Sequence, residues 1–573
     1  MDGNRVGGVP DVLMLAVIGC AVALGALVWV WGGLAGAIFG AGWPRVPAAD
    51  VLGVLARLPA RIADPGRAWP ASVRGQLPGA GGFYLTLALL LGAATTIGGL
   101  AGRAAGRPAL RRRSGAARWA SAAELRSLRA GPLAMPSRRP AAGDGARLTL
   151  GWRRGRLLRA ERRHALVAFG PPQSGKSAGL AIPALLEWAG PAVATSIKTD
   201  LLSATLSRRR ELGAVFVFDP FGLAGVRSHT WSPLHGADTW DGALEAAWRL
   251  AASGEIDSRG VEGGDFWAVA AEQRLAPLLF TAARTGATMD EVLRWTYGQG
   301  SRELHEALTR LAERAQTEHE RAGAHAAYDA VRAFEAQADR TRTSIEATAQ
   351  ALLRGYRFER VASSARGCEV TPDAVLGEPA TLYLIGDAKA AKLLRPIFLA
   401  LLCAIVDRAY ERATAAGGRL PLPLLLCLDE AGNVAPLPNL AEIASTAPSH
   451  NIQLVSIFHD LAQARSRYGR QAQTVVNSHR ARMLLPGVAD LETLRYFAGL
   501  LGEEEAPDLT RTTGAGGSSR STARRRRPLL APEALRQLPD GHALLLYGRV
   551  APAQVRLRMW FSDRRLRRLA RQG

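Results

Sequence analysis

Two long stretches near the N-terminus contain no charged residue, and both are strongly apolar. The first covers residues 12–44 and the second covers residues 75–102. Each stretch exceeds the ~20 residues that a helix needs to cross the hydrocarbon core of a membrane. A cleaved signal peptide is the alternative for the first stretch, but its length and its residues Trp29 and Trp31 disfavour that interpretation. The pattern therefore predicts two membrane-spanning helices.

Arginines after the second stretch predict how these helices are oriented. Six arginines lie between residues 103 and 118, and basic flanks of membrane helices tend to stay in the cytoplasm. We therefore predict a multi-pass protein of the cytoplasmic (cell) membrane whose main body lies in the cytoplasm. The predicted segments are a cytoplasmic N-terminus at 1–11, transmembrane helices at 12–40 and 82–102, an extracytoplasmic loop at 41–81 and a basic cytoplasmic linker at 103–146.

From about residue 147 onward, short apolar runs alternate with helical stretches. A hairpin is expected at "LTLGW" and "GRLLRA", followed by strand-like runs at "HALVAF", "PAVAT", "AVFVFD", "TLYLIGD", "PLLLCLDEAG" and "IQLVSIF". Strands that alternate with helices indicate a mostly parallel sheet covered on both faces. The pattern therefore predicts an α/β domain.

The alternation stops over residues 241–373, where Ala, Glu, Arg and Leu predominate. Apolar positions such as Leu304, Leu308 and Leu311 follow helical spacing. This segment is therefore predicted to be an all-helical insertion, which divides the α/β domain into parts at 147–240 and 374–563.

Two basic segments near the C-terminus lack a clear periodic pattern. Residues 503–528 are rich in Gly, Ser and Thr, contain few apolar residues and end in four consecutive arginines. Such composition predicts a flexible basic loop. Residues 564–573 are expected to form a basic C-terminal tail.

The overall charge of the chain says little about whether it binds nucleic acid. The formal net charge is +22, but only four of the 72 basic residues are lysines. That arginine bias indicates a GC-rich genome, so the charge alone is modest evidence for a nucleic-acid partner. The four cysteines are widely separated and include no CxxC pair. They disfavour a zinc site or a disulfide framework and fit a reducing cytoplasm.

The most specific motif is "GPPQSGKS" at residues 170–177, which matches the phosphate-binding pattern G-x-x-x-x-G-K-[ST]. Its glycines let the backbone approach the phosphates closely, and its preceding apolar strand and following helix are the expected context. Lys176 is expected to bind the β- and γ-phosphates of ATP, and Ser177 to ligate Mg²⁺. The predicted nucleotide-binding residues are Gly170, Pro171, Pro172, Gln173, Ser174, Gly175, Lys176, Ser177 and Ala178.

A second motif, "LLLCLDEAGN", supplies the acidic partner that such a loop requires. Asp429 and Glu430 directly follow an apolar strand. Asp429 is expected to hold Mg²⁺, and Glu430 to act as the general base toward the attacking water. The adjacent pair favours hydrolysis by a RecA-type motor over phosphoryl transfer by a kinase.

These motifs, taken in order, resemble the type IV coupling proteins, the TraG/TraD-like membrane ATPases of conjugation and type IV secretion. The resemblance covers nearly the whole chain and includes "ARWASAAELRSL", "ATSIKTDLLSAT", "VFVFDPFG", "DFWAVAAEQRLAPLL" and "HDLAQARSRYGRQAQTVVNSH" in addition to the two motifs above. It implies a RecA-like P-loop ATPase with an all-helical insertion, assembled as a homo-hexamer on the membrane. Such proteins dock relaxase-bound single-stranded DNA or effector proteins to a type IV secretion channel and use ATP.

Two positions depart from the family pattern. His459 stands where many members carry a Gln, and an imidazole can also donate to a γ-phosphate, so His459 is a third catalytic candidate beside Lys176 and Glu430. Pro448, Ser449 and His450 stand where the family often has an Arg that acts on the neighbouring subunit's nucleotide.

Two alternative functions therefore stay open. One is a DNA translocase of the FtsK/SpoIIIE type, although the winged-helix DNA reader usual in that class is not evident. The other is a membrane cargo receptor that binds ATP with little hydrolysis, which the changes at His459 and Pro448 would favour.

Overall fold

The computed structural model describes residues 9–105, 117–129, 147–257, 264–514 and 517–571. The chain forms two compact units, unit 1 (Met1–Gly115) and unit 2 (Ala116–Gly573). Part of the predicted cytoplasmic N-terminus (1–11) and much of the predicted linker (103–146) lie outside the described residues.

The described residues of unit 1 form three α-helices and short turns: α1 (Val9–Phe39), α2 (Ala48–Arg57) and α3 (Ala80–Ala105). Its small core centres on Trp69 and Phe83, which are fully buried. Trp31 Nε1 donates a 2.8 Å hydrogen bond to the backbone oxygen of Phe83. Gly32 admits the Trp69 ring, because a Cβ at this position would lie 1.9 Å from a ring carbon.

Within the part of the chain that the structure describes, no helix combines the length and apolar character required to cross a membrane. The two spans predicted over residues 12–40 and 82–102 are therefore not confirmed.

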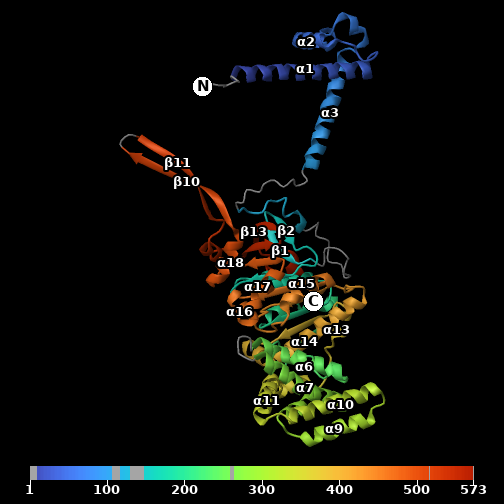
Figure 1. Ribbon diagram of the computed structural model, residues 1–573, viewed down its shortest axis with the longest axis vertical. Coiled ribbons are helices and arrows are strands. Elements are labelled where there is room, and N and C mark those ends of the chain that lie inside the picture. The colour runs from blue at the N-terminus through green and yellow to red at the C-terminus, as the bar shows by residue number, and fades with distance from the viewer. Residues whose placement is uncertain (1–8, 106–116, 130–146, 258–263, 515–516, 572–573) are drawn as a thin grey trace, which may run out of the picture. The chain divides into compact units, whose positions relative to one another are not determined.

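Unit 2 is built on a mixed sheet (Figure 1). Among the described residues, its eleven strands follow the order β2-β1-β13-β12-β9-β3-β8-β7-β4-β6-β5. The strands from β9 to β5 run parallel to one another, and the strands from β2 to β12 continue the sheet in antiparallel fashion. Their bounds are β1 (Thr149–Arg153), β2 (Arg156–Arg159), β3 (Leu166–Phe169), β4 (Ala192–Ser196), β5 (Val215–Phe218), β6 (Thr381–Ile385), β7 (Leu424–Leu428), β8 (Ile452–Phe458), β9 (Ala481–Leu484), β12 (His542–Tyr547) and β13 (Val550–Arg556).

Both faces of this sheet are covered, as expected for central parallel strands. Successive side chains of a strand point to opposite faces. On β3, Val167 and Phe169 accordingly belong to one hydrophobic core, and Leu166 and Ala168 belong to the other. The covering helices are α4 (Ile182–Glu187), α5 (Asp200–Leu212), α14 (Ala388–Ala415), α15 (Leu440–Thr446), α16 (Leu461–Tyr468), α17 (Ala472–Ser478), α18 (Leu491–Leu501) and α19 (Pro532–Arg536).

Most of the helical segment between β5 and β6 gathers at one end of unit 2, away from β1, β2 and β13, and its last helix lies beside α14 (Figure 1). Leu304 and Leu308 are buried in it, at the helical spacing noted in the sequence. Its helices are α6 (Trp240–Asp257), α7 (Gly264–Thr285), α8 (Met289–Thr296), α9 (Ser301–Arg314), α10 (Glu318–Glu335), α11 (Asp339–Leu353), α12 (Glu359–Ser364) and α13 (Pro372–Gly377).

Residues 503–528 do not form the predicted flexible loop. They form an antiparallel ribbon of β10 (Glu503–Gly514) and β11 (Gly517–Pro528). Glu504 lies opposite Arg527 in this ribbon and forms a 2.8 Å ion pair with it. The ribbon is a two-stranded sheet separate from the main one, and residues 524–527, all arginines, are exposed on it. The apolar alternation that identifies a half-buried strand is therefore missing from its sequence.

The predicted basic tail also adopts regular structure, as α20 (Arg564–Arg571). Leu566 and Leu569 are buried on its inner side and belong to the core that also contains α4 and α5. Two leucines among many arginines in so short a helix form too weak a periodic pattern to be recognised in the sequence.

Candidate functional site

The 170–177 loop connects β3 to a helix that begins with a wide π-helical turn (Ser177–Ala181) and continues as α4. Two of its residues adopt positive φ angles, Gln173 at 66° and Gly175 at 89°. A side chain at Gly175 would also collide with Met559, whose Cε would lie 2.5 Å from the added Cβ. The positive φ angle therefore favours glycine at position 175, and the flexible end of the Met559 side chain packs where a Cβ would lie.

Lys176 is buried beneath this loop. Its Nζ donates hydrogen bonds to the backbone oxygens of Gly170 (2.6 Å) and Pro171 (3.3 Å) and lies 3.8 Å from Glu430 Oε1. Burial lowers the pKa of Lys176, while the nearby carboxylates of Glu430 and Asp429 oppose that shift. The result is a cation held at the centre of the loop and close to an acid.

Asp429 directly follows β7, and its side chain contacts the end of the phosphate-binding loop. Ser177 Oγ donates a 2.6 Å hydrogen bond to Asp429 Oδ2, although the two residues are 252 positions apart. Thr195 Oγ1, from β4, donates to the backbone oxygen of Asp429 at 3.0 Å. Burial raises the pKa of Asp429 to about 6, because the hydrogen bond from Ser177 offsets only part of the desolvation. Among the described residues, its buried Oδ1 has no hydrogen-bond partner.

Glu430 adopts a left-handed backbone conformation, with φ of 61°. This conformation is unusual for a residue other than Gly, Asn or Asp and stores strain that the surroundings must offset. Asn433 Nδ2 donates to Glu430 Oε2 at 3.0 Å, and His459 Nε2 lies 2.8 Å from the same oxygen. Burial raises the pKa of Glu430, but the hydrogen bond with His459 and the charge of Lys176 outweigh it, so the pKa lies below its ordinary value.

His459 follows β8, which pairs with both β3 and β7. Its backbone N–H donates to Gln463 Oε1 at 2.8 Å, and its Nδ1 lies 3.3 Å from Lys176 Nζ. An ammonium group only donates, so Nδ1 is the acceptor and the imidazole proton lies on Nε2, which donates to Glu430. His459 therefore connects the loop lysine to the acid.

The structure brings together the five candidates whose side chains were assigned to catalysis or metal binding: Lys176, Ser177, Asp429, Glu430 and His459. The other candidate residues form the loop and the first helical turn: Gly170, Pro171, Pro172, Gln173, Ser174, Gly175 and Ala178. Their chemical roles stay predictions.

Three polar residues that contact Asp429, Glu430 or His459 had not been singled out from the sequence. They are Thr195, Asn433 and Gln463. Asn433 lies in the same motif as Glu430, so its spacing could have indicated the contact. Gln463 lies four residues after His459 in one of the quoted motifs, so its spacing could also have indicated the contact. Thr195 acts from a different strand and carries no local signal.

The segment at Pro448–His450, where the family often has an Arg, forms a short turn between α15 and β8. The His450 side chain faces the backbone oxygen of Thr446 at 3.2 Å, and its ring packs against Tyr410.

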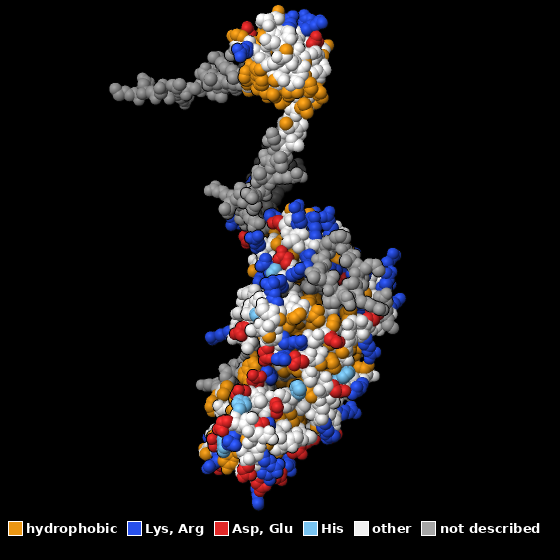
Figure 2. Space-filling model, turned by 90° about the vertical axis from the view of Figure 1, so that its right-hand side faces the viewer, with side chains coloured by type: hydrophobic (Ala, Val, Ile, Leu, Met, Phe, Trp, Pro, Cys, Tyr) orange, Lys and Arg blue, Asp and Glu red, His pale blue; other side chains and the backbone are white. Residues whose placement is uncertain are grey.

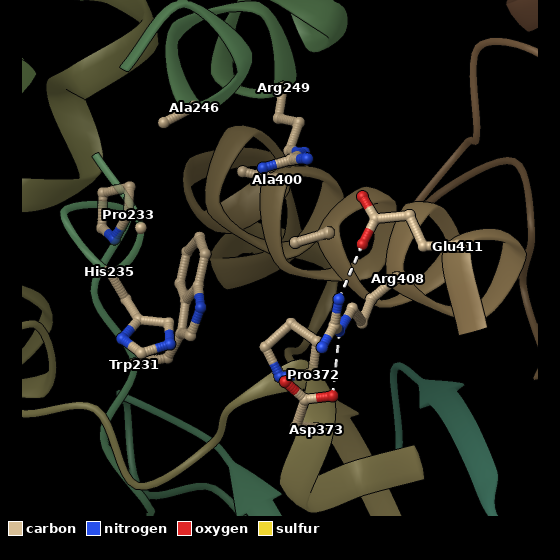
Figure 3. A pocket seen from close by; sticks show the side chains of 12 residues that line it. Trp231, Pro233, His235, Ala246, Arg249, Pro372, Asp373, Ala400, Arg408 and Glu411 are labelled. Atoms are coloured by element: carbon tan, nitrogen blue, oxygen red, sulfur yellow. Dashed lines mark hydrogen bonds and ion pairs between the residues drawn. The ribbon is translucent and has the colours of Figure 1, made fainter. Parts of the chain in front are cut away.

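Another cavity, of about 200 Å³, lies between α6, α13 and α14, and none of the candidate residues lines it. Its charged side chains are largely paired with one another (Figure 3). Arg408 donates to Asp373 and to Glu411, both at 2.9 Å. This cavity therefore offers little uncompensated charge to a ligand.

Comparison with known proteins identifies relatives along most of the chain. The chain is 25% identical to the conjugal transfer protein TraG of Escherichia coli over 65% of this chain and 61% of that protein. It is also 25% identical to VirD4 of Rhizobium rhizogenes over 80% of this chain and 67% of that protein. The alignment with TraG thus spans less than two thirds of the relative's length.

Solved structures of the plasmid coupling protein TrwB have the same fold. The structure of TrwB with a non-hydrolysable ATP analogue matches 77% of this chain and 93% of that chain, with a TM-score of 0.53 and 19% identity. The α/β RecA-like architecture predicted from the sequence is thereby confirmed.

The family model for conjugative DNA transfer by the type IV secretory system matches residues 129–572. Because this match extends over most of the chain, the protein belongs to the type IV secretory system family of conjugative DNA transfer proteins.

Proposed function

We propose that this protein is an ATP-hydrolysing coupling protein, which drives relaxase-linked single-stranded DNA, protein, or both into a type IV secretion channel. The observation that carries the proposal is the arrangement of Lys176, Glu430 and His459 at the carboxyl edge of the parallel sheet. A site that only bound nucleotide would not need a buried carboxylate held in place by two hydrogen bonds.

In this proposal the loop residues bind the triphosphate of ATP. Their backbone N–H groups surround the α- and β-phosphates, and Lys176 binds the β- and γ-phosphates. Lys176 is already held at the centre of the loop by two backbone oxygens. It exchanges these contacts for phosphate oxygens when nucleotide binds.

The residues also fit Mg²⁺. The buried Asp429 Oδ1 lacks a partner among the described residues, and the Ser177 hydroxyl lies beside the same carboxylate. Mg²⁺ prefers such hard oxygen ligands and takes most of its remaining ligands from water and phosphate, so two protein groups suffice. When bound, the ion neutralises charge on the phosphates. Ser177 and Asp429 would hold it, and Thr195 would keep the Asp429 backbone in place.

Glu430 is the proposed general base. Its lowered pKa keeps it ionised at neutral pH, so it can accept a proton from a water molecule. His459 and Asn433 both donate to Glu430 Oε2, which leaves Oε1 to face the substrate side together with Lys176. His459 thus orients the base and stands beside the expected position of the γ-phosphate.

The relatives support the proposed cargo and partners in general terms. TrwB has been solved with ADP and Mg²⁺, TraG is a conjugal transfer protein, and the matching family model describes conjugative DNA transfer by the type IV secretory system. For this chain we propose single-stranded DNA bound without sequence preference, a relaxase or effector protein, and components of a type IV channel as partners. We also propose assembly as a homo-hexamer, which analytical ultracentrifugation of the detergent-solubilised chain would test.

We also propose that unit 1 attaches the protein to the cytoplasmic membrane. Hydrophobic side chains gather on the surface of unit 1 (Figure 2). Leu27 on α1 and Leu91 on α3 are 67% and 60% exposed, and exposed apolar patches mark sites of membrane or protein interaction. Retention of the chain in the membrane pellet after alkaline carbonate extraction would support this location. Release into the supernatant would contradict it.

The central experiment measures steady-state ATP hydrolysis by the purified full-length chain, with and without single-stranded DNA. We expect turnover in the wild type, stimulation by single-stranded DNA, and a loss of at least about 100-fold in Lys176→Ala. Lys389→Ala is the matched control, because Lys389 is an exposed lysine on α14 outside the site. Equal turnover in wild type and Lys176→Ala would overturn the proposal.

The same assay separates the two alternatives. ATP binding without measurable turnover, combined with intact cargo transfer in cells, would favour the cargo receptor. Stimulation by double-stranded rather than single-stranded DNA would favour the translocase of the FtsK/SpoIIIE type.

A further inference from the structure

The segment at residues 557–563, which follows β13, packs directly against the phosphate-binding loop. Met559 touches the loop at Gly175, where its Cε would lie 2.5 Å from an added Cβ. The backbone N–H of Trp560 donates a 3.0 Å hydrogen bond to the backbone oxygen of Ala178. This segment is therefore joined to both the end of the loop and the first turn of the following helix.

Buried ion pairs hold the segment in place. Arg558 is 2% exposed, and its guanidinium contacts Glu187 Oε1 and Asp563 Oδ2, each at 2.7 Å. Glu187 is the last residue of α4, so this contact fixes the segment to the helix that leaves the loop. Within the segment, residues 559–562 form a turn, in which the backbone N–H of Ser562 donates to the Met559 oxygen at 3.1 Å. The residues between Arg558 and Asp563 are thus presented on a rigid support.

The sheet order indicates which end of a bound nucleotide would meet this segment. Asp429 and His459 follow β7 and β8, which lie on one side of β3. The 557–563 segment follows β13, which lies on the other side of β3, beyond β9 and β12. In the proposed function the γ-phosphate lies near Glu430. The phosphate chain then extends from Glu430 across the loop, so the nucleoside is expected on the opposite side, where the 557–563 segment lies.

The exposed side chains of the segment have the chemistry that a nucleobase requires. Phe561 is 55% exposed, and Trp560 is half-buried. Their rings form an edge-to-face pair with centroids 6.2 Å apart. Together with the polarisable thioether of Met559, which contacts the loop at Gly175, they give the segment an apolar, aromatic surface. Aromatic side chains stack on any base, because every base has a π-face.

We propose that Met559, Trp560 and Phe561 form a base shelf, on which the purine ring of the nucleotide packs. This inference rests on the proposed function, because it assumes that the loop binds a nucleoside triphosphate. The nearby polar side chains are engaged within the protein. Ser562 Oγ donates to the Met559 oxygen, and both oxygens of Asp563 accept from Arg558. The base shelf therefore binds by stacking and accepts adenine and guanine with similar affinity.

The test compares ligands that share the phosphates but differ in the base. Isothermal titration of the full-length chain uses ATP, GTP and inorganic tripolyphosphate, each with Mg²⁺. Trp560→Ala and Phe561→Ala should weaken ATP and GTP binding roughly 5- to 100-fold, as expected for loss of base stacking. Tripolyphosphate affinity should stay within twofold, and Trp560→Phe should restore most of the ATP affinity. Phe358→Ala is the matched control, since Phe358 is 45% exposed and precedes α12 in the helical segment.

The possible results have distinct meanings. Unchanged ATP affinity in both alanine variants would overturn the base shelf, and so would an equal loss of tripolyphosphate affinity, which would indicate a supporting role for the loop. Phe561→Ala keeps the test valid if Trp560→Ala fails to fold, because the exposed Phe561 side chain contributes little to the core. A wild type that binds tripolyphosphate and ATP with equal affinity overturns the base shelf alone. A wild type that binds neither ligand overturns the proposed function and, with it, this inference.

Discussion

His459 Nε2 lies 2.8 Å from Glu430 Oε2, and the same imidazole accepts a hydrogen bond from Lys176 through Nδ1. The three residues follow three adjacent strands, β8, β7 and β3. Parallel strands end at the same edge of a sheet, so side chains distant in sequence converge there. The imidazole is thus the physical connection between the phosphate-binding cation and the proposed base.

The first prediction concerns His459 itself. His459→Gln should keep kcat within about threefold, because the amide can donate to Glu430 and accept from Lys176 as the imidazole does. His459→Ala removes a hydrogen bond to a charged group and should lower kcat by about 10- to 100-fold, with KM for ATP little changed. Steady-state kinetics of the full-length chain test both, with His450→Ala as the control. Equal activity of His459→Ala and wild type would exclude a positioning role.

The second prediction separates binding from hydrolysis. Glu430→Gln keeps the size of the side chain but removes the proton acceptor. We expect kcat to fall by at least about 100-fold, while the Kd for ATP stays within about threefold, because Lys176 and the loop are unaltered. Calorimetry and phosphate-release assays measure the two quantities. If turnover persists in Glu430→Gln, another group is the base.

The third prediction uses the raised pKa of Asp429. Since its folded-state pKa of about 6 exceeds the ordinary value of 3.8, the folded protein binds more protons than the unfolded chain between about pH 4 and pH 6. Stability contributed by this group therefore falls as the pH rises through that window. Above pH 6 the buried carboxylate costs up to about 3 kcal/mol at ~1.4 kcal/mol per pKa unit.

Asp429→Asn should accordingly raise the melting temperature by a few degrees at pH 7.5 without Mg²⁺, and change it little at pH 4.5. Mg²⁺ should stabilise the wild type at pH 7.5 and not stabilise Asp429→Asn. Differential scanning fluorimetry measures these shifts, and the exposed Asp238→Asn serves as the control. A pH-independent effect of Asp429→Asn would contradict the prediction.

The fourth prediction concerns Arg558. Its removal leaves Asp563 without its ion pair and leaves Glu187 with Arg159 as its cation. Arg558→Ala should therefore lower the free energy of unfolding of unit 2 by about 3 kcal/mol at pH 7, the lower end of the range for breaking a buried ion pair. Burial raises the pKa of Glu187 and of Asp563, but the charge and hydrogen bonds of Arg558, joined at Glu187 by the charge of Arg159, outweigh it, so both pKa values lie below their ordinary ones.

The stabilisation from these carboxylates is therefore present above about pH 4 and is lost as the pH falls through their lowered folded-state pKa values. Urea denaturation from pH 7 to pH 3 should show the difference between wild type and Arg558→Ala shrinking at the acid end. A difference below about 1 kcal/mol at pH 7 would show that the ion pairs are not a major support.

Much of unit 2 could be predicted from local sequence patterns. The apolar runs "HALVAF", "PLLLCLDEAG" and "IQLVSIF" correspond to β3, β7 and β8, because a strand buried on both faces needs a continuous apolar run. The helical spacing of Leu304 and Leu308 likewise predicted a helix, which is α9. Strand β9 and the hairpin of β12 and β13 were not identified, and neither was the β10–β11 ribbon, whose composition resembles that of a loop.

The sequence by itself determined the phosphate-binding loop, the acids at the end of an apolar strand and the α/β pattern, because each depends on residues within about ten positions. Only the tertiary structure decided that Ser177 contacts Asp429, that His459 joins Glu430 to Lys176, and that Met559 covers Gly175. These contacts depend on strand order and on which sheet edge each loop reaches. Both are set by packing across hundreds of residues, which no local pattern encodes.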